Sequence, residues 1–270
     1  GYRTDLLNRN KVAYYLKSTT SNLPDDLRTV GSKTPNMEHH MLKFYYNTAP
    51  NPMKVALFLE EAGLDYEPVP VDSRQGDQFK PDYVAINPNS KAPSIVDDGN
   101  VVFDSNAILL YLGEKTGKFM PADTLAARGD LLSWMMFVAT GIGPYSGQSV
   151  HFRHFAPAGN EYGVNRYLYE AERHYGILND RLANQPYMMG DSYTIVDMCV
   201  WGWARMVPFV IGDTALDGMA NLKRLVDEIS ARPAAERALS IKDRNGHTFK
   251  AEMDEQAKKF MFPQNERLAS

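Results

Sequence analysis

The order in which strand and helix patterns follow each other limits the fold of this chain more than any other feature of its sequence. Residues 42–116 give the order strand, helix, strand, helix, strand, strand, helix, at 42–46, 51–62, 66–71, 79–85, 94–96, 101–103 and 105–116. Asn51 is expected to cap the first helix, with Pro52 at its first position, and Gly63 to end it. This order predicts a thioredoxin-like domain.

From Pro121 onward the pattern is helical only, with helical spacing over 125–139, 160–184, 194–210 and 218–231. Thr194 and Asp197 are spaced as in a capping box, and Arg232–Pro233 should close the last helix. We therefore expect a two-domain protein, α+β followed by all-α. The expected boundaries are an N-terminal extension or arm at 1–40, a thioredoxin-like domain at 41–122, an all-helical domain at 123–240 and a tail packed on the body at 241–270.

Composition argues against several classes of function. A net charge of −4 provides no basic surface for nucleic acid or an anionic membrane, and no apolar run approaches the roughly 18 residues of a membrane span. Cys199 is the only cysteine, so no intramolecular disulfide is possible, and its apolar neighbours predict a buried thiol. A cytoplasmic location fits best. The start at Gly1 indicates a processed or tagged end, and the acidic residues within 1–40 argue against a transit peptide.

The turn between the first strand and the first helix contains the residues best suited to chemistry. A helix N-terminus offers free N–H groups and a partial positive charge to an anion such as a thiolate. Asn51 can add an amide donor there and Thr48 a hydroxyl. Taken alone, Asn51 is also consistent with an ordinary N-cap and Thr48 with a plain turn residue.

Two further segments could bind a peptide. Lys91-Ala92-Pro93 precedes a strand, and a cis bond before Pro93 would expose the Ala92 backbone for antiparallel pairing. Asp104 and Ser105 precede an apolar helix; they could cap it, or they could hold the ammonium and carboxylate of an amino-acid head group.

These segments occur in the order and at about the spacing of the cytosolic glutathione transferases, and the resemblance covers about residues 41–235. The chain resembles the nu class of bacterial glutathione transferases, and it is also similar to the related fungal nitrogen-regulator and prion protein. The matching stretches are Ala49-Pro50-Asn51, Phe58-Leu59-Glu60-Glu61, residues 87–93, 103–105 with 108–112, Gly147-Gln148, His151-Phe152 and Ala156-Pro157.

The resemblance implies a homodimer that binds glutathione as a cosubstrate in each N-terminal domain. Carried to the matching positions, the glutathione contacts are Asn51 at the sulfur, Gln78 and Lys91 at the glycyl end, Ala92 before a cis Pro93 at the cysteinyl backbone, Asp104 and Ser105 at the γ-glutamyl head, and Arg166 from the helical domain. One residue departs from the pattern: the nu class has Thr where this chain has Ala49, and Thr48 lies one place earlier. The role of the Thr48 hydroxyl is therefore open.

The remaining candidates are less specific. Tyr145, Phe152 and Trp203 are candidates for the wall of an acceptor site, although each is also consistent with core packing. Tyr45 and Tyr46 lie in a strand whose alternation turns one of them inward, so each is mainly a core or rim residue. The histidines of the 151–154 segment have no third ligand nearby in sequence, so no metal is expected.

Residues 44–53 contain neither Ser nor Cys, which excludes a mixed disulfide with the protein at this turn. The first hypothesis is therefore a glutathione-dependent disulfide-bond reductase whose bound thiolate attacks a small disulfide, or an organic hydroperoxide in a peroxidase reaction. The alternatives are conjugation of glutathione to small or aromatic electrophiles, and a non-catalytic glutathione-binding regulatory protein.

Overall fold

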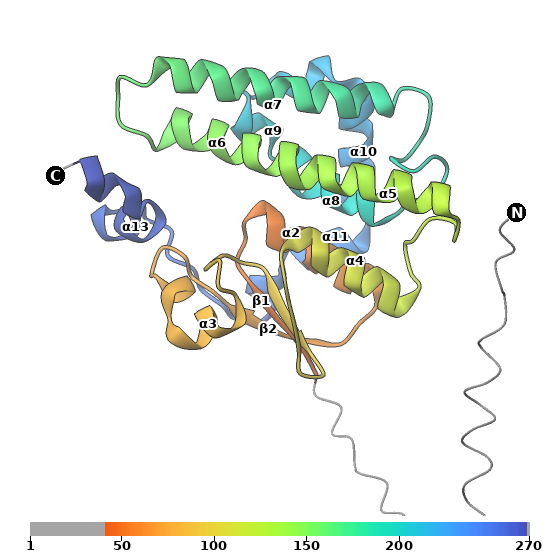
Figure 1. Cartoon of the computed structure of the whole chain (residues 1–270), viewed down its shortest axis with the longest axis horizontal. Coiled ribbons are helices and arrows are strands. Elements are labelled where there is room, and N and C mark those ends of the chain that lie inside the picture. The colour runs from red at the N-terminus through yellow and green to blue at the C-terminus, as the bar shows by residue number, and fades with distance from the viewer. Residues whose placement is uncertain (1–40, 269–270) are drawn as a thin grey trace, which may run out of the picture. The chain divides into compact units, whose positions relative to one another are not determined.

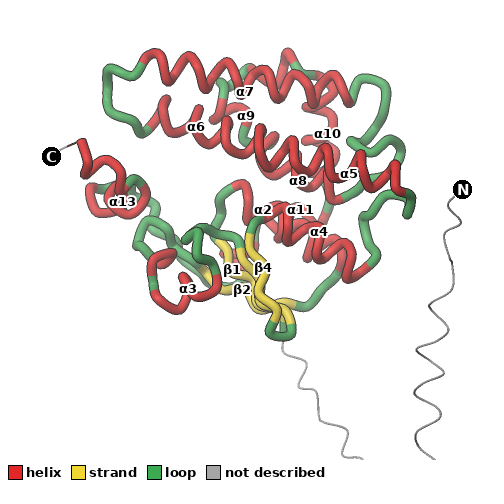
Figure 2. Tube along the Cα trace, in the orientation of Figure 1, coloured by secondary structure: helices red, strands yellow, loops and turns green. Residues whose placement is uncertain are grey.

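A four-stranded mixed sheet lies in the first part of the region that the computed structural model describes, residues 41–268; the arm predicted at 1–40 lies outside it. The strands are β1 (Leu42–Tyr46), β2 (Tyr66–Pro70), β3 (Ser94–Asp97) and β4 (Asn100–Phe103), in the spatial order β2-β1-β3-β4. They are yellow in Figure 2. β1 pairs parallel with β2 and antiparallel with β3, and β3 pairs antiparallel with β4. This is the sheet that the order of patterns predicts.

Local sequence explains the strands. Leu42, Phe44 and Tyr46 alternate along β1 and are all buried, so this face of the strand enters the core. The turn between β3 and β4 consists of Asp98 and Gly99, with φ values of 48° and 82°. Two consecutive residues with positive φ are what a tight hairpin of right-handed twist requires.

Helices α2 (Pro50–Ala62), α4 (Ser105–Thr116) and α11 (Pro233–Leu239) lie between the sheet and the helices of residues 125–230 (Figure 1). The α2 and α4 helices end as expected, at Gly63 and Gly117 in the left-handed conformation. Between β2 and β3 lie a 3₁₀ turn, η2 (Asp77–Phe79), and α3 (Pro81–Ile86).

The helical part packs on α2 and α4 through α8 (Ile195–Ala204), of which every residue except Trp203 is buried. The predicted capping box of Thr194 and Asp197 is present at the start of α8. The other helices of this part are α5 (Leu125–Phe137), the π-helical turn η3 (Val138–Ile142), α6 (Gly143–His154), α7 (Glu161–Arg181), α9 (Val207–Val210), η4 (Ala215–Gly218) and α10 (Ala220–Ser230).

Two helices of this part were not expected from the sequence. The α6 helix lies between the helical patterns at 125–139 and 160–184, in a glycine-rich segment. In the fold one of these glycines leaves room for a ring: a Cβ on Gly141 would lie 2.5 Å from the His174 ring. The predicted end of a helix before Pro233 is confirmed, since α10 ends at Ser230, but α11 then starts at Pro233 and was not expected.

The C-terminal tail runs from the helical part back to the sheet. It contains α12 (Ile241–Arg244), α13 (Glu255–Met261) and the 3₁₀ turn η5 (Pro263–Leu268). Phe249 packs edge-on against Tyr46, while the Phe260 ring lies directly over Gly76. Both contacts place the tail beside β1 and the segment that follows β2.

Candidate active site

The sheet register brings the three predicted binding segments to one edge of the sheet. Tyr45 of β1 pairs with Ser94 of β3, and Ser94 pairs with Phe103 of β4. β1 and β4 both run antiparallel to β3. The turn after β1, the segment before β3 and the start of α4 after β4 therefore lie next to one another.

The turn after β1 is shaped by Asn47. Its Oδ1 accepts a hydrogen bond from Ala49 N (3.1 Å), and its Nδ2 donates to Ser73 Oγ (3.1 Å). Ala49 is the N-cap residue of α2, and Pro50 is the first helical residue, where a missing N–H costs nothing. The sequence reading placed Asn47 in a turn but missed that its side chain holds the turn.

Asn51 is not the N-cap of α2, contrary to the sequence prediction. Pro50 starts the helix earlier, so Asn51 lies within its first turn and its side chain is not used for capping. Its Oδ1 accepts a hydrogen bond from the indole Nε1 of Trp203 (2.9 Å). No acceptor for its Nδ2 is present among residues 41–268. The amide therefore has a free donor beside the positive end of a 13-residue helix.

The hydroxyl groups near this turn differ in environment. Thr48 is exposed. Tyr46 is the inward-facing tyrosine of β1, and its hydroxyl hydrogen bonds to Nδ1 of His247 (2.9 Å). Burial raises the pKa of Tyr46 to about 12, with the nearby Asp243 carboxylate as a second cause. Tyr46 therefore stays protonated and contributes to packing of the tail.

The segment before β3 has the predicted cis bond between Ala92 and Pro93. Tyr83 OH (2.7 Å) and Asn87 Nδ2 (2.6 Å) both donate hydrogen bonds to the Lys91 carbonyl and so fix the backbone of this segment. The Lys91 side chain is exposed. Sequence reasoning missed both supporting residues; the Asn-Pro pair at 87–88 signals a turn, but nothing in the sequence marks Tyr83.

The start of α4 is capped by Asp104, whose Oδ1 accepts from Asn106 N (2.9 Å) and Ala107 N (3.1 Å). Asp104 has φ +72°, a backbone conformation that non-glycine residues adopt mainly where function or tight geometry demands it. Ser105 is buried and accepts a hydrogen bond from Lys54 Nζ (3.4 Å). Its own O–H remains available as a donor.

Lys54 is a fully buried lysine that the sequence reading overlooked. Burial lowers its pKa, with opposing contributions from Cys199 and Asp104. A lysine at a position that packs into an apolar helix face was the available signal, since Met53, Val55 and their neighbours in α2 are also buried. Its amino group donates hydrogen bonds to Ser105 Oγ and to Asn106 Oδ1, both at 3.4 Å.

Gln78 is buried under the C-terminal tail. Its Nε2 donates to Ser73 O (3.2 Å) and to Phe260 O (3.4 Å), while its Oε1 has no partner among the described residues. The tail residue Phe262 also contacts the His151 ring of α6, at 4.8 Å between ring centroids. The tail thus contacts both the thioredoxin-like part and the helical part.

The predicted residues of the helical part lie in different places. Trp203 reaches Asn51. Tyr145 and Phe152 both pack against Tyr167 of α7, at centroid distances of 6.3 and 5.0 Å. Arg166 is about half exposed and pairs with Glu170 within α7 (2.9 Å). The structure joins only Trp203 of this group directly to the turn after β1.

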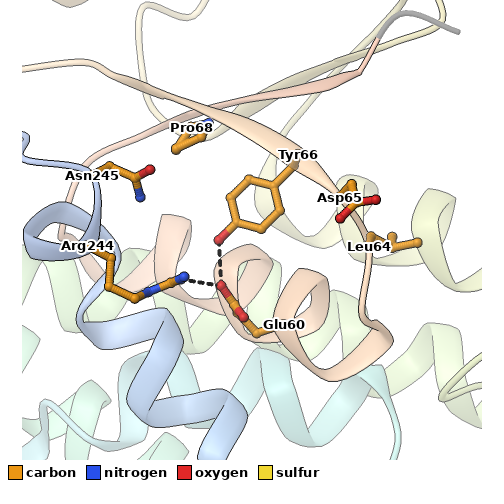
Figure 3. A pocket seen from close by; sticks show the side chains of 7 residues that line it. All are labelled: Glu60, Leu64, Asp65, Tyr66, Pro68, Arg244 and Asn245. Carbon is orange, nitrogen blue, oxygen red and sulfur yellow. Dashed lines mark hydrogen bonds and ion pairs between the residues drawn. The ribbon is translucent and has the colours of Figure 1, made fainter.

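A shallow depression on the outside of the thioredoxin-like part is distinct from these segments. Figure 3 shows that Tyr66 and Arg244 both point at the Glu60 carboxylate, which accepts from the tyrosine hydroxyl at 2.8 Å. Arg237 adds a second ion pair at 2.7 Å. The Glu60 carboxylate is thus paired within the protein, and this cluster links α11 and α12 to α2.

Two general properties of the described region bear on function. Within residues 41–268, no three His, Cys, Asp or Glu side chains are grouped so that they could bind a metal ion. No helix of the same region is long and apolar enough to cross a membrane. Cys199 is fully buried as predicted, and burial raises its thiol pKa to about 12.

Comparison with known proteins agrees with this geometry. The model of the glutathione S-transferase N-terminal domain matches residues 41–114, and that of the C-terminal domain matches residues 134–233. Disulfide-bond oxidoreductase YfcG of Escherichia coli (strain K12) is 41% identical over 74% of this chain and 94% of its own length. Protein URE2 of Eremothecium gossypii is 37% identical over 55% of this chain and 44% of its own.

Solved structures agree as well. A glutathione transferase from Pseudomonas putida, solved with one glutathione disulfide per subunit, superposes with a TM-score of 0.71 at 32% identity, covering 77% of this chain and 94% of that one. The predicted fold, a thioredoxin-like domain followed by a helical domain, is confirmed by these matches and by the structure itself. The chain belongs to the glutathione S-transferase family.

Proposed function

We propose that this chain is a glutathione-dependent disulfide-bond reductase. The observation that supports this best is the free amide donor of Asn51 at the N-terminus of α2, at a turn that carries no cysteine. A donor at a helix N-terminus favours the thiolate form of a bound thiol. The name of the E. coli relative and the ligand of the P. putida structure are consistent with disulfide chemistry.

The reaction requires two molecules of glutathione. The bound thiolate attacks one sulfur of a small disulfide, forms a mixed disulfide and releases the other sulfur as a thiolate, which takes up a proton. A second glutathione thiolate attacks the mixed disulfide and releases the second thiol. Glutathione disulfide leaves with the two electrons given up by glutathione. With an organic hydroperoxide the same thiolate would attack the distal oxygen and break the O–O bond, so that glutathione sulfenic acid forms and the alkoxide leaves and takes up a proton. The second glutathione thiolate would then attack the sulfenic sulfur, giving glutathione disulfide and water.

Around the sulfur we propose the contacts that the family resemblance implies. The Ala92 backbone, which makes no backbone hydrogen bond within residues 41–268, would pair with the cysteinyl residue. Ser105 and Asp104 would hold the γ-glutamyl head, supported by the buried Lys54 amino group, which donates a hydrogen bond to Ser105 Oγ. The remaining proposed contacts are Gln78 and Lys91 at the glycyl end, Arg166 from α7 and Thr48 beside the sulfur.

Steady-state reduction of 2-hydroxyethyl disulfide by glutathione, coupled to glutathione reductase, tests this function. Chlorodinitrobenzene conjugation on the same preparation tests the main alternative. Asn51→Ala should lower disulfide turnover about 10²-fold with a modest loss of glutathione affinity, because it removes a donor to developing negative charge. Tyr46→Phe is the control and should retain turnover. Unchanged turnover in Asn51→Ala would remove Asn51 from the mechanism, and fast conjugation with slow disulfide reduction would reassign the function.

We further propose a cytoplasmic homodimer. β4 is an edge strand of the sheet, and its Val101 and Phe103 side chains are 47% and 42% exposed. Exposed apolar side chains on an edge strand are normally covered by a partner. A cytoplasmic location would supply the reduced glutathione that the reaction consumes. Sedimentation equilibrium of the wild type and of Phe103→Glu tests the dimer.

A further inference from the structure

Trp203 fixes which way the Asn51 amide points. The indole Nε1–H can only donate a hydrogen bond, so the amide atom that faces it at 2.9 Å has to be the oxygen. The Asn51 NH₂ group is therefore turned away from Trp203. An asparagine without such a partner has two nearly equivalent amide orientations, of which only one offers a donor to an anion.

The indole lies beside α6. A Cβ on Gly143 would be 3.5 Å from the Trp203 Nε1, and one on Gly147 would be 3.9 Å from the far edge of the ring, both ordinary contact distances. On α8, a Cβ on Gly202 would lie 2.8 Å from the Pro50 carbonyl. The backbone of α8 thus approaches the start of α2 closely, which sets the distance between the indole and Asn51.

We propose that Trp203 is a positioning residue that orients the Asn51 amide so that its NH₂ group faces the sulfur of glutathione. This inference rests on the proposed function of the site. With the correct orientation already set, the thiolate gains a donor without any rearrangement. Without the indole N–H, the buried side of the amide loses its partner, and the orientation with the oxygen toward the sulfur becomes populated.

Trp203→Phe keeps an aromatic ring at this position but removes the indole N–H donor together with part of the ring volume, a loss that the control below shares. We expect it to lower disulfide turnover about five- to tenfold, the effect of losing one hydrogen bond. We also expect the pKa of bound glutathione to rise by about 0.7 to 1 unit, corresponding to the same factor. The thiolate absorbance of the bound tripeptide, titrated against pH, reports this pKa without requiring turnover.

Trp201→Phe is the matched control. Trp201 lies on the same helix and also donates its indole N–H, to Ser230 Oγ at 3.0 Å, but it is fully buried away from Asn51. Both variants lose one indole hydrogen bond, so both should change stability. Only Trp203→Phe should shift the thiol pKa. If Trp203→Phe does not fold, Trp203→Leu, which also lacks a hydrogen-bond donor, is used for the same measurement.

The double variant Trp203→Phe with Asn51→Ala decides whether Trp203 acts through Asn51. We expect it to match Asn51→Ala alone in turnover and in thiol pKa, since no amide remains to be oriented. Equal thiol pKa values in wild type and Trp203→Phe, or an unchanged Trp203 effect in the Asn51→Ala background, would overturn the inference. A wild-type protein that binds glutathione without reducing disulfides would refute the proposed function only, because the pKa comparison would still hold.

Discussion

Replacing Asp197 by Ala should strongly destabilise the protein. Its carboxylate is completely buried and accepts hydrogen bonds from Met188 N (2.7 Å), Thr194 N (2.8 Å) and Thr194 Oγ1 (3.2 Å). The hydroxyl can rotate to another acceptor, but the two buried backbone N–H groups cannot. A buried donor without an acceptor costs about 1 to 3 kcal/mol, so the free energy of unfolding should fall by about 4 kcal/mol.

Asp197→Asn makes the test sharper because it preserves the volume of the side chain. The two carboxylate oxygens serve the two N–H groups separately, and an amide has only one oxygen. One N–H would keep its acceptor and the other would face an NH₂ group. The expected loss is therefore about half as large, about 2 kcal/mol.

Urea unfolding followed by circular dichroism and by tryptophan fluorescence measures both losses. Asp227→Asn on the exposed face of α10 is the control; it removes an exposed ion pair with Lys223 and should cost less than about 1 kcal/mol. A loss below about 1 kcal/mol for Asp197→Ala, or equal losses for both Asp197 variants, would refute the hydrogen-bond count as the source of this stability.

Two other predictions concern buried groups. Cys199 should react with a thiol reagent only when the protein unfolds, because the group is buried and its pKa is raised to about 12; rapid labelling of the native protein would contradict this. Burial raises the pKa of Glu60, but hydrogen bonds from Arg237 and Tyr66 outweigh burial, and the pKa is lowered. The ionised Glu60 therefore stabilises the fold above the ordinary pKa of a glutamate, and this stabilisation is lost as the pH falls through the lower pKa of the folded protein. The stability difference between wild type and Glu60→Gln in urea should therefore shrink from about pH 7 to about pH 3, and a difference that does not depend on pH would argue against this ion pair.

Several elements could be predicted because they depend on the preferences of residues that are close together in the sequence. The two-residue turn at Asp98 and Gly99, the left-handed stop at Gly117 and the capping box at the start of α8 each depend on residues that are neighbours along the chain. The three predicted binding segments also lie together, because strand order and direction bring the end of β1, the start of β3 and the end of β4 to one edge of the sheet.

Other features depended on contacts between distant residues. The helix at 143–154 was missed because the reason for a nearby glycine is a distant contact: the His174 ring, far along the chain, fills the space beside Gly141. The partner of Asn51 is 152 residues away, and that of Lys54 is 51 residues away. Pattern reasoning located Asn51 but could not show what orients its amide.

The tail contact also has a consequence for the order of folding during synthesis. The Tyr46 hydroxyl meets His247 across 201 residues, and Asp72 accepts from the backbone of Lys250 across 178. At about 5 to 20 residues per second, the ribosome needs about 10 to 40 s to supply these partners after β1 has emerged. Until then, this side of β1 in the thioredoxin-like part stays uncovered, and residues made 201 positions later complete its packing.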